Sequence, residues 1–500
     1  MACRLLKQPV PMKHISFSLL VALSACVDQP AVDTHAEPLA QTQDGTPVGP
    51  SYTNFCRTVT VTGSVFYNDL RTHGRFTLRA KPDGTDGTRE SFGSGDNVNY
   101  LALRDAQVDI YEADLSYGSG ASCFATALMG TTTVERDGTF SWTGQVCETC
   151  GADLDGGQND DLSIAAKISL RNCDDANTRC FSVRDPNGAG VSNHFDDNWD
   201  GTTWSRWHAG ASSTSPKRIG GTSANAGTDY FQATGNPTSQ AARAANVFAS
   251  MVDVTRKVHV QIGVPFGQPE VAAYFPNVIG GIAHSHESGR LCVTDPGSNA
   301  WIDGSEPIHE YGHLVHYWAW DDHGKWVSYC YDDNHDGIEN NNECAESYSQ
   351  EEYANAAFKE GWADFIAGVT LDGTGSSKGC DAMEADGNLL GCPGCVSETG
   401  RHFFRDVTRV LCDVWDEPGE CVQRGNAVYC DNTDETLVTM VNDLEDVWAH
   451  ANADDRREVE TADENHPAIV STFGICTLFD ELGDSGISTT FKASGLDCGS

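Results

Sequence analysis

The sequence is poor in positive charge. Only 10 of its 500 residues are lysine, and Lys and Arg together number 32 against 72 Asp and Glu. The formal net charge is therefore −40 at pH 7. A surface this negative repels a phosphate backbone, which argues against nucleic acid as a partner. Most of the acidic excess is aspartate, and such a composition is typical of a salt-rich medium, of calcium binding, or of both.

The sequence also lacks an apolar run of transmembrane length. The run at 15–25 follows Met12-Lys13-His14 and is too short to cross a bilayer, but it has the length of a signal peptide. We therefore expect residues 1–25 to be removed and translation to begin at Met12. The run ends in Leu-Ser-Ala-Cys26, which resembles the lipobox of bacterial lipoproteins. This resemblance implies an exported protein anchored in a membrane by a lipid on Cys26, with plain signal-peptidase cleavage as the alternative.

Cysteines are numerous, but a second C-x-x-C pair at zinc-ribbon spacing is missing. Of the 19 cysteines, all but Cys3 and Cys26 lie beyond the leader. So many cysteines in an exported chain predict disulfides, and their odd number predicts at least one free thiol. We interpret the pairs Cys147/Cys150 and Cys392/Cys395 as disulfide partners.

The first half of the chain predicts strands. Residues 26–55 are rich in Pro, Asp, Thr and Gln, which predicts a disordered stalk. From 56 to 185, short runs alternate apolar and polar residues as half-buried strands do. The clearest runs are 59–67, 106–111, 131–135, 138–142 and 162–170. Their order resembles the transthyretin-like or carboxypeptidase-regulatory-like domains, and this resemblance implies an all-β sandwich at 56–185.

The next segment, 186–240, is rich in Gly, Ser, Thr and Asn and predicts loops. The pattern then predicts a helix at 240–254, a strand at 258–262 and a hairpin at 281–294. Helical patterns dominate from 301 onward.

The run His309-Glu310-Tyr-Gly-His313 contains candidate metal-binding and catalytic residues. Apolar residues at 308, 312, 315 and 319 recur at helical spacing, which predicts an amphipathic helix that begins near Glu306. His309 and His313 then share one face, where two imidazoles can reach one Zn²⁺. Glu310 lies beside the open coordination position, where it can take a proton from water. A third ligand is required.

A second helix is predicted around 349–369, with a capping-box pattern at its start and an apolar stripe at 358, 362, 365 and 369. Glu360 and Asp364 project from another face, so Glu360 is the candidate third ligand and Asp364 the candidate partner of a ligand imidazole. H-E-x-x-H followed by E-x-x-x-D resembles the gluzincin, or thermolysin-like, zinc metallopeptidases. The resemblance covers about 300–370. It implies His309, His313 and Glu360 as zinc ligands, Glu310 as general base and Asp364 as orienting residue. A structural helix with an exposed Glu-Asp pair is the alternative.

Other histidines fit a metal site less well. The metzincin pattern requires a glycine at 316 and a ligand at 319, where this chain has His316 and Ala319. His316 lies about 10 Å of helix rise beyond His309, so we interpret it as a groove or packing histidine. His284 and His286 share one face of a strand, where lining of a substrate groove or solvation is favoured over metal binding.

Residues 332–343 resemble a calcium loop of EF-hand type. Oxygen ligands stand at loop positions 1, 3, 5 and 12, a main-chain carbonyl at position 7 and a glycine at position 6. The candidate calcium ligands are Asp332, Asn334, Asp336, Ile338 and Glu343. A solvated Asx-rich turn is the alternative. The segment 196–201 repeats only the start of this pattern.

Together these features predict a multidomain protein. An all-β sandwich precedes an α+β zincin-like catalytic unit at 186–375 and a mainly helical, disulfide-bearing lobe at 376–500. The expected function is that of an exported zinc peptidase that hydrolyses peptide or protein substrates, with Zn²⁺ and Ca²⁺ as cofactors. The alternative is a zinc-stabilised surface adhesion or binding protein on a peptidase scaffold. A transition-state donor would separate the two, and the candidates, which match no motif, are Tyr353, Arg401 and His402.

Overall fold

The fold is taken from a computed structural model, and Thr53–Ser500 form one compact unit in it. The residues that the structure describes are 56–71, 79–80, 86–87, 100–113, 124–147, 163–173, 179–186, 202–207, 217–218, 222–233, 236–264, 270–276, 284–286, 289–295, 304–319, 354–372, 379–380, 404–415, 421–424, 427–430 and 437–442. They form a mixed α/β, strand-rich arrangement of several sheets and helices. Within these ranges, no helix is long and apolar enough to cross a membrane.

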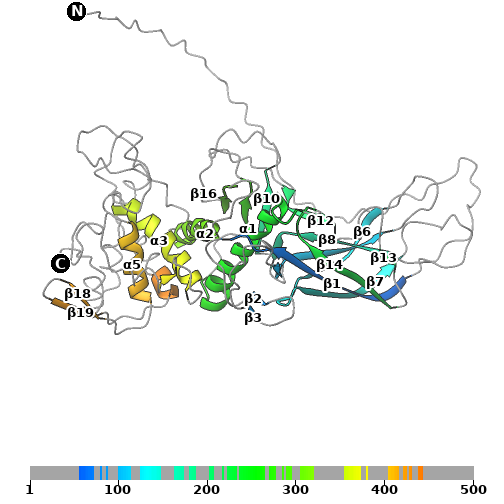
Figure 1. Cartoon of the computed structure of the whole chain (residues 1–500), viewed down its shortest axis with the longest axis horizontal. Helices are drawn as coiled ribbons and strands as arrows, with labels where there is room; N and C mark the ends of the chain where they lie inside the picture. Colours follow the sequence, from blue (N-terminus) through cyan, green and yellow to red (C-terminus); the bar gives the residue numbers. More distant parts are fainter. Residues whose placement is uncertain are drawn as a thin grey trace, which may run out of the picture. The chain divides into compact units, whose positions relative to one another are not determined.

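The first sheet is built around its longest strand. It has the order β14-β1-β4, and β7 also pairs with β1 (Figure 1). Its strands are β1 (Cys56–Asn68), β4 (Tyr100–Ala102), β7 (Thr139–Cys147) and β14 (Ser223–Tyr230). Along β1, valines alternate with Thr and Ser, and successive side chains of a strand point to opposite faces. The valines are buried in the core, while the hydroxyl side chains face outward.

The second sheet shares its core with the first. It has the order β12-β8-β5-β6, and β13 also pairs with β8. Its strands are β5 (Gln107–Ala113), β6 (Phe124–Thr133), β8 (Ser163–Ser169), β12 (Ser205–Trp207) and β13 (Lys217–Arg218). Buried side chains of both sheets, such as Val61, Phe140, Ile110 and Ile168, belong to one hydrophobic cluster. The five runs predicted as strands overlap β1, β5, β6, β7 and β8.

The third sheet adjoins the helices and has the order β11-β10-β15-β17-β16, with β9 paired to β10. Its strands are β9 (Arg171–Cys173), β10 (Cys180–Asp185), β11 (Thr202–Thr203), β15 (Glu270–Tyr274), β16 (His284–His286) and β17 (Arg290–Cys292). β16 and β17 are antiparallel, which confirms the hairpin predicted at 281–294. Two further strand pairs are β2 (Arg79–Ala80) with β3 (Asp86–Gly87) and β18 (Cys421–Arg424) with β19 (Ala427–Cys430).

Strands on both sides of residue 185 share sheets, since β1 pairs with β14 and β10 with β15, in parallel in both cases. The loops predicted for 186–240 are therefore partly wrong, because β11 to β14 lie there. In β14 the buried positions are held by Ala224, Ala226 and Asp229. Two alanines and an aspartate make too weak an apolar alternation to be recognised as a strand in the sequence.

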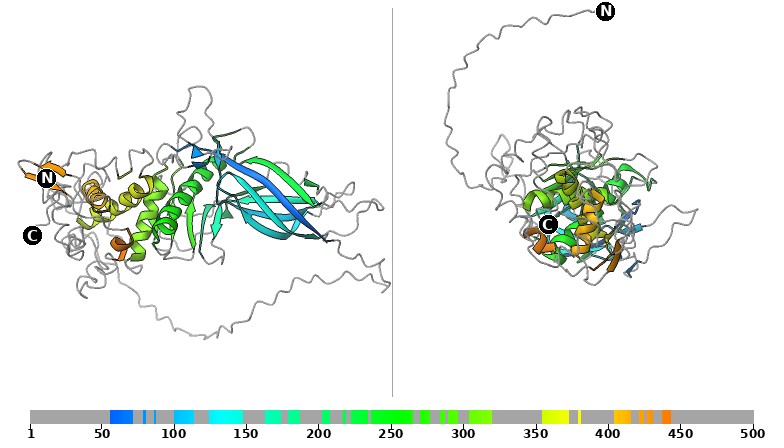
Figure 2. Two further views of the ribbon diagram at one scale, coloured as in Figure 1. Left: turned by 90° about the horizontal axis from the view of Figure 1, so that it is seen from below. Right: turned by 90° about the vertical axis from the view of Figure 1, so that its left-hand side faces the viewer.

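The longer α-helices of the described residues are, in chain order, α1 (Gln240–Thr255), α2 (Glu306–Ala319), α3 (Ala354–Leu371) and α5 (Phe404–Trp415). α1 packs against β1 and β10 and also against α2, so it lies between the sheets and the other helices (Figures 1 and 2). α3 packs on α2 and on α5. α1 matches the prediction for 240–254, and its N-terminus is capped by Ser239, whose hydroxyl accepts from the N–H of Ala242.

The strand predicted at 258–262 is wrong. Residues Arg256–Ile262 continue α1 as a π-helix, η1, which ends at Gly263 with φ 97°. The alternation of Val258, Val260 and Ile262 is typical of a strand, yet Val258 is fully buried while Val260 is 73% exposed. Tertiary contacts of the intervening His259, described below, hold the helical conformation instead.

Disulfides are present, as the cysteine content predicts. Cys173 is joined to Cys180 between β9 and β10, and Cys380 to Cys412 on α5. Cys292 on β17 is buried with a free thiol. Both C-x-x-C pairs include residues outside the described ranges.

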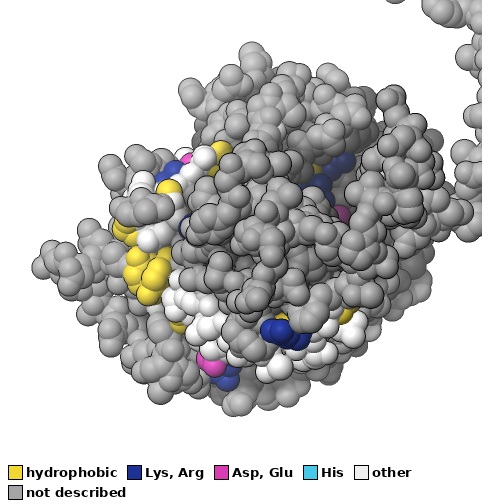
Figure 3. Space-filling view, turned by 90° about the vertical axis from the view of Figure 1, so that its right-hand side faces the viewer, with side chains coloured by type: hydrophobic (Ala, Val, Ile, Leu, Met, Phe, Trp, Pro, Cys, Tyr) yellow, Lys and Arg dark blue, Asp and Glu magenta, His cyan; other side chains and the backbone are white. Residues whose placement is uncertain are grey.

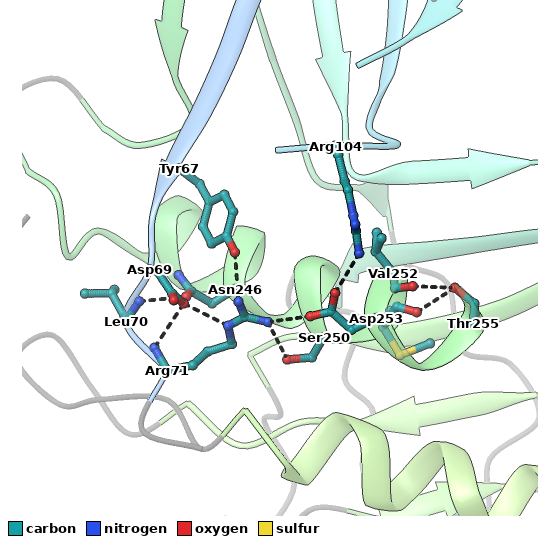
Figure 4. A network of polar contacts seen from close by, with 11 residues as sticks. Tyr67, Asp69, Leu70, Arg71, Arg104, Asn246, Ser250, Val252, Asp253 and Thr255 are labelled. Carbon is teal, nitrogen blue, oxygen red and sulfur yellow. Dashed lines mark hydrogen bonds and ion pairs between the residues drawn. The ribbon is translucent and has the colours of Figure 1, made fainter. Parts of the chain in front are cut away.

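A buried ionic network ties α1 to the end of β1 (Figure 4). The guanidinium of Arg71 is completely buried and contacts Asp69 at 2.8 Å and Asp253 at 3.1 Å. It also donates to the hydroxyl of Tyr67, and burial raises the pKa of that hydroxyl. The second carboxylate oxygen of Asp253 accepts from Arg104 at 2.9 Å. Asp253 therefore forms ion pairs with two arginines at once.

We expect Asp253→Asn to lower the free energy of unfolding by about 1–3 kcal/mol, because the buried guanidinium of Arg71 and the half-buried guanidinium of Arg104 lose a charged partner. Urea unfolding should show a lower midpoint with an unchanged slope. Glu135→Gln, an exposed acidic residue, is the control and should change stability by less than about 0.5 kcal/mol. An Asp253→Asn midpoint equal to that of the parent would contradict the importance of this network.

Candidate metal centre

Three metal-ligating side chains converge where α2 meets α3. One ring nitrogen each of His309 and His313 and one carboxylate oxygen of Glu360 all lie within 4.8 Å of one another. Oε2 of Glu360 is 3.2 Å from Nε2 of His309 and 3.3 Å from Nε2 of His313. Among the described residues, this is the group of His, Cys, Asp or Glu side chains that could hold a metal ion.

Helix α2 supplies two of these groups because of its four-residue spacing. His309 and His313 lie one turn apart on the same face, with ring centroids 4.8 Å apart and ring planes perpendicular. The helix begins at Glu306, as predicted. The N–H of Thr294 donates to Oε1 of Glu306 at 3.0 Å, which fixes the first turn against the end of the third sheet.

Helix α3 reaches the histidines because Gly312 allows a close approach. A Cβ at position 312 would lie 2.7 Å from Cα and 2.8 Å from the carbonyl oxygen of Ala363. The predicted apolar stripe of α3 is buried, and it consists of Phe358, Trp362, Phe365 and Val369. With that stripe in the core, Glu360 and Asp364 face α2.

Asp364 fixes the orientation of one histidine. Nδ1 of His309 donates to Oδ1 of Asp364 at 2.8 Å, so this nitrogen carries the proton in the neutral ring. In a neutral ring, the form that can bind a metal, Nε2 would present its lone pair toward Glu360 and His313. Metal-ligating histidines in general donate their other N–H to a carboxylate or carbonyl in this way.

We expect Asp364→Ala to lower the affinity for zinc by about 10–100-fold, because His309 loses its orienting partner. Competition with a chromogenic chelator would measure this affinity. Thr370→Ala, a substitution at a buried hydroxyl of α3 that bonds the carbonyl of Ile366, is the control and should leave zinc affinity unchanged. Equal affinities of parent and Asp364→Ala would show that Asp364 does not orient a ligand.

The electrostatics of the group favour a positive charge among its members. Burial opposes protonation of His309, but hydrogen bonds to Asp364 and Glu360 outweigh it and hold the pKa of His309 above its usual value. Burial lowers the pKa of His313 to about 4, against the attraction of Glu360. For Glu360, burial is outweighed by the two histidines and Lys359, so its pKa lies well below the usual range. The site therefore stabilises a positive charge beside the carboxylates of Glu360 and Asp364.

The two carboxylate oxygens of Glu360 have different neighbours, and Lys359 is near one of them. Its ammonium lies 3.7 Å from Oε1, while Oε2 is the oxygen that faces both histidines. The side chain of Lys359 is only 8% exposed. A buried lysine could not be predicted at this position, since an exposed lysine of an amphipathic helix has the same pattern.

Glu310 lies outside the convergent group of three. It is buried and follows His309 on α2. Burial raises the pKa of the Cys292 thiol on β17, and the negative charge of Glu310 raises it further. α2, the helix that carries Glu310, packs against β16 and β17 of the third sheet.

His316 is also outside the convergent group. Its buried ring meets Phe358 edge to face, with centroids 5.7 Å apart. Burial, with the nearby charges of His313 and Lys359, lowers its pKa to about 3. These contacts agree with a packing histidine.

His259 supports α2 from the opposite side. Its Nδ1 donates to the carbonyl of Val264 at 2.6 Å, so Nε2 accepts from the hydroxyl of Tyr311 at 2.5 Å. Burial lowers the pKa of His259 to about 4, so the ring is neutral at pH 7. In the sequence, Tyr311 lies between His309 and His313. Sequence reasoning missed His259, because position 311 tolerates any residue in the H-E-x-x-H pattern.

Several predicted residues lie outside the described part of the chain. These are Cys26, the five candidate calcium ligands, the segment 196–201, and Tyr353, Arg401 and His402. His284 and His286 lie on β16, the edge strand beside β17.

No family model, no curated protein and no solved structure matches the chain. The interpretation of the centre therefore depends on its own residues. Two imidazoles and one carboxylate are a donor set that suits zinc and leaves room for a further ligand.

Proposed function

We propose that this chain is an exported, zinc-dependent peptidase of gluzincin type. The observation that supports this most is the convergence of His309, His313 and Glu360 with Asp364 behind His309, while Glu310 stays outside the ligand group. The H-E-x-x-H motif alone is suggestive but not decisive. A third ligand and an orienting carboxylate, both on a second helix, are the further features expected of a metal site.

The proposed reaction is hydrolysis of a peptide bond. Zinc held by the three ligands would supply Lewis acidity, which lowers the pKa of water toward 7 and polarises the peptide carbonyl. Glu310 accepts a proton from the attacking water and then donates it to the nitrogen of the leaving amine. Asp364 keeps Nδ1 of His309 protonated, so that Nε2 remains a ligand throughout.

We propose the finer architecture on the same basis. An all-β region at 56–185 would share sheets with the zincin-like unit at 186–375 that follows it, and the region 376–500 would form the second lobe of the cleft. The packing of α3 on α5 supports a joint between these last two parts. A lipid on Cys26 would hold the protein at the cell envelope, and the loop 332–343 would bind calcium between the two zinc-binding segments.

Removal and return of the metal tests the function. We expect phenanthroline to abolish cleavage of denatured casein, and a stoichiometric amount of Zn²⁺ to restore it, whereas Mg²⁺ should not. Denatured casein and a peptide library with free and blocked termini would detect endo- and exopeptidase activity. If the parent binds zinc and cleaves none of these substrates, the zinc-stabilised binding protein replaces the peptidase.

A further inference from the structure

The outward side of the first sheet carries no charged side chain over three neighbouring strands. We call this surface the uncharged face. It consists of alternate residues of 58–64 on β1, 139–145 on β7 and, across a bulge, 223–230 on β14. These twelve residues are Ser, Thr, Asn, Gln and Tyr, and each is exposed or half-buried. In a chain with 21% charged residues, a surface of this size without one Asp, Glu, Lys or Arg is unusual.

Hydroxyl groups on this face stand in register. The hydroxyls of Thr60 and Thr143 lie 2.9 Å apart across β1 and β7, and those of Ser64 and Thr228 lie 2.8 Å apart across β1 and β14. Neighbouring strands are about 4.8 Å apart, and same-side residues of one strand about 6.8 Å apart. Each hydroxyl can both donate and accept a hydrogen bond. The face is therefore a regular array of neutral donors and acceptors.

An aromatic group closes one end of the array. Tyr230 on β14 is 40% exposed, and its ring centroid lies 4.2 Å from that of Tyr100 on β4 and 6.2 Å from that of Phe66 on β1. A tyrosine in this position offers an apolar ring face together with a hydroxyl.

The strand preference of threonine does not account for this composition. On the outer side of the second sheet, Asp109, which is only 8% exposed, lies directly opposite the half-buried Lys167, so charged residues do occur on the other sheet of the same core. Figure 3 views the end of the two sheets and shows a group of hydrophobic side chains there, with small separate groups of Lys, Arg, Asp and Glu.

We propose that the uncharged face binds a neutral polysaccharide. Sugar hydroxyls match the donors and acceptors of the array, and neither surface has to desolvate an ionic group. Polyanions are disfavoured by the net charge of −40. A protein partner or a second copy of this chain would require an apolar centre, which a face of hydroxyl and amide side chains does not supply. This inference is independent of the proposed peptidase activity.

The test measures depletion of the full chain from solution by microcrystalline cellulose, chitin and insoluble starch, with an alginate gel as the acidic comparison. We expect at least one neutral polymer to bind the chain and alginate to leave it in solution. Thr62→Glu and Tyr230→Ala should weaken the binding about tenfold or more. Thr62→Gln, which is isosteric with the Glu variant, should retain it.

Thr133→Glu places the same charge on an exposed position of the second sheet and should bind as the parent does. Melting curves identify any variant that fails to fold. Binding to none of the three neutral polymers, or equal binding by Thr62→Glu and Thr62→Gln, would overturn the proposal. So would a dimer in sedimentation equilibrium that Thr62→Glu abolishes, because the face would then belong to a second copy of the chain.

Discussion

Glu310→Gln is expected to keep one zinc per chain and to lose peptide hydrolysis by about 10²–10⁴-fold. The loss follows from the removal of a general base, which contributes a factor of this size. The zinc remains because Glu310 lies outside the group formed by His309, His313 and Glu360. Turnover of a fluorogenic peptide and metal content must be measured on the same sample, since only their combination separates a base from a ligand.

The matched control for this variant is Glu306→Gln, four residues earlier on α2. Glu306 accepts from the N–H of Thr294 and is not one of the three convergent residues. We expect it to retain most of the activity. If Glu310→Gln cleaves peptide as fast as the parent, the proposed mechanism is wrong. If it loses zinc together with activity, Glu310 is a ligand, and the assignment of three ligands is wrong.

Gly312→Val is expected to lower the free energy of unfolding by about 3 kcal/mol and to reduce zinc affinity at least about tenfold. Even the Cβ of alanine would lie 2.7 Å from Cα of Ala363, so a branched side chain must push α3 away from α2. Glu360 moves with α3, whereas His309 and His313 stay on α2. Urea unfolding and chelator competition measure the two effects.

Asp253→Asn provides the control for loss of stability alone. It weakens the network between β1 and α1, far along the chain from the three ligands, so the folded protein should bind zinc as the parent does. Gly312→Ala should show a smaller version of both effects of Gly312→Val. A Gly312→Val protein with unchanged zinc affinity would show that the approach of α2 and α3 at this glycine does not position Glu360.

The convergent group could be predicted because both of its helices have strong local signals. The apolar spacing around His309 and the buried stripe around Trp362 determine which faces of α2 and α3 point inward. The polar residues of the two helices can then lie close to one another. The distance between the helices could not be predicted, since it depends on Gly312 packing against Ala363. Sequence periodicity contains no information on such contacts between segments 50 residues apart.

The errors occur where tertiary contacts determine the local conformation. Residues 258–262 have the alternation of a strand, yet hydrogen bonds of His259 to Val264 and Tyr311 accompany a π-helix. β14 was missed because alanine and aspartate fill its buried positions, and because it pairs in parallel with β1, more than 150 residues earlier. The salt bridge of Arg206 to the buried Asp229 stabilises that unusual strand.

Metal analysis of the purified chain tests the central claim most directly. The parent, Glu360→Ala and Glu310→Gln would be dialysed against the same zinc buffer and analysed by mass spectrometry of their metal content. The account predicts one zinc per chain in the parent and in Glu310→Gln, and a content near zero in Glu360→Ala. Equal zinc in the parent and in Glu360→Ala, or no zinc in the parent, would contradict a metal centre formed by His309, His313 and Glu360.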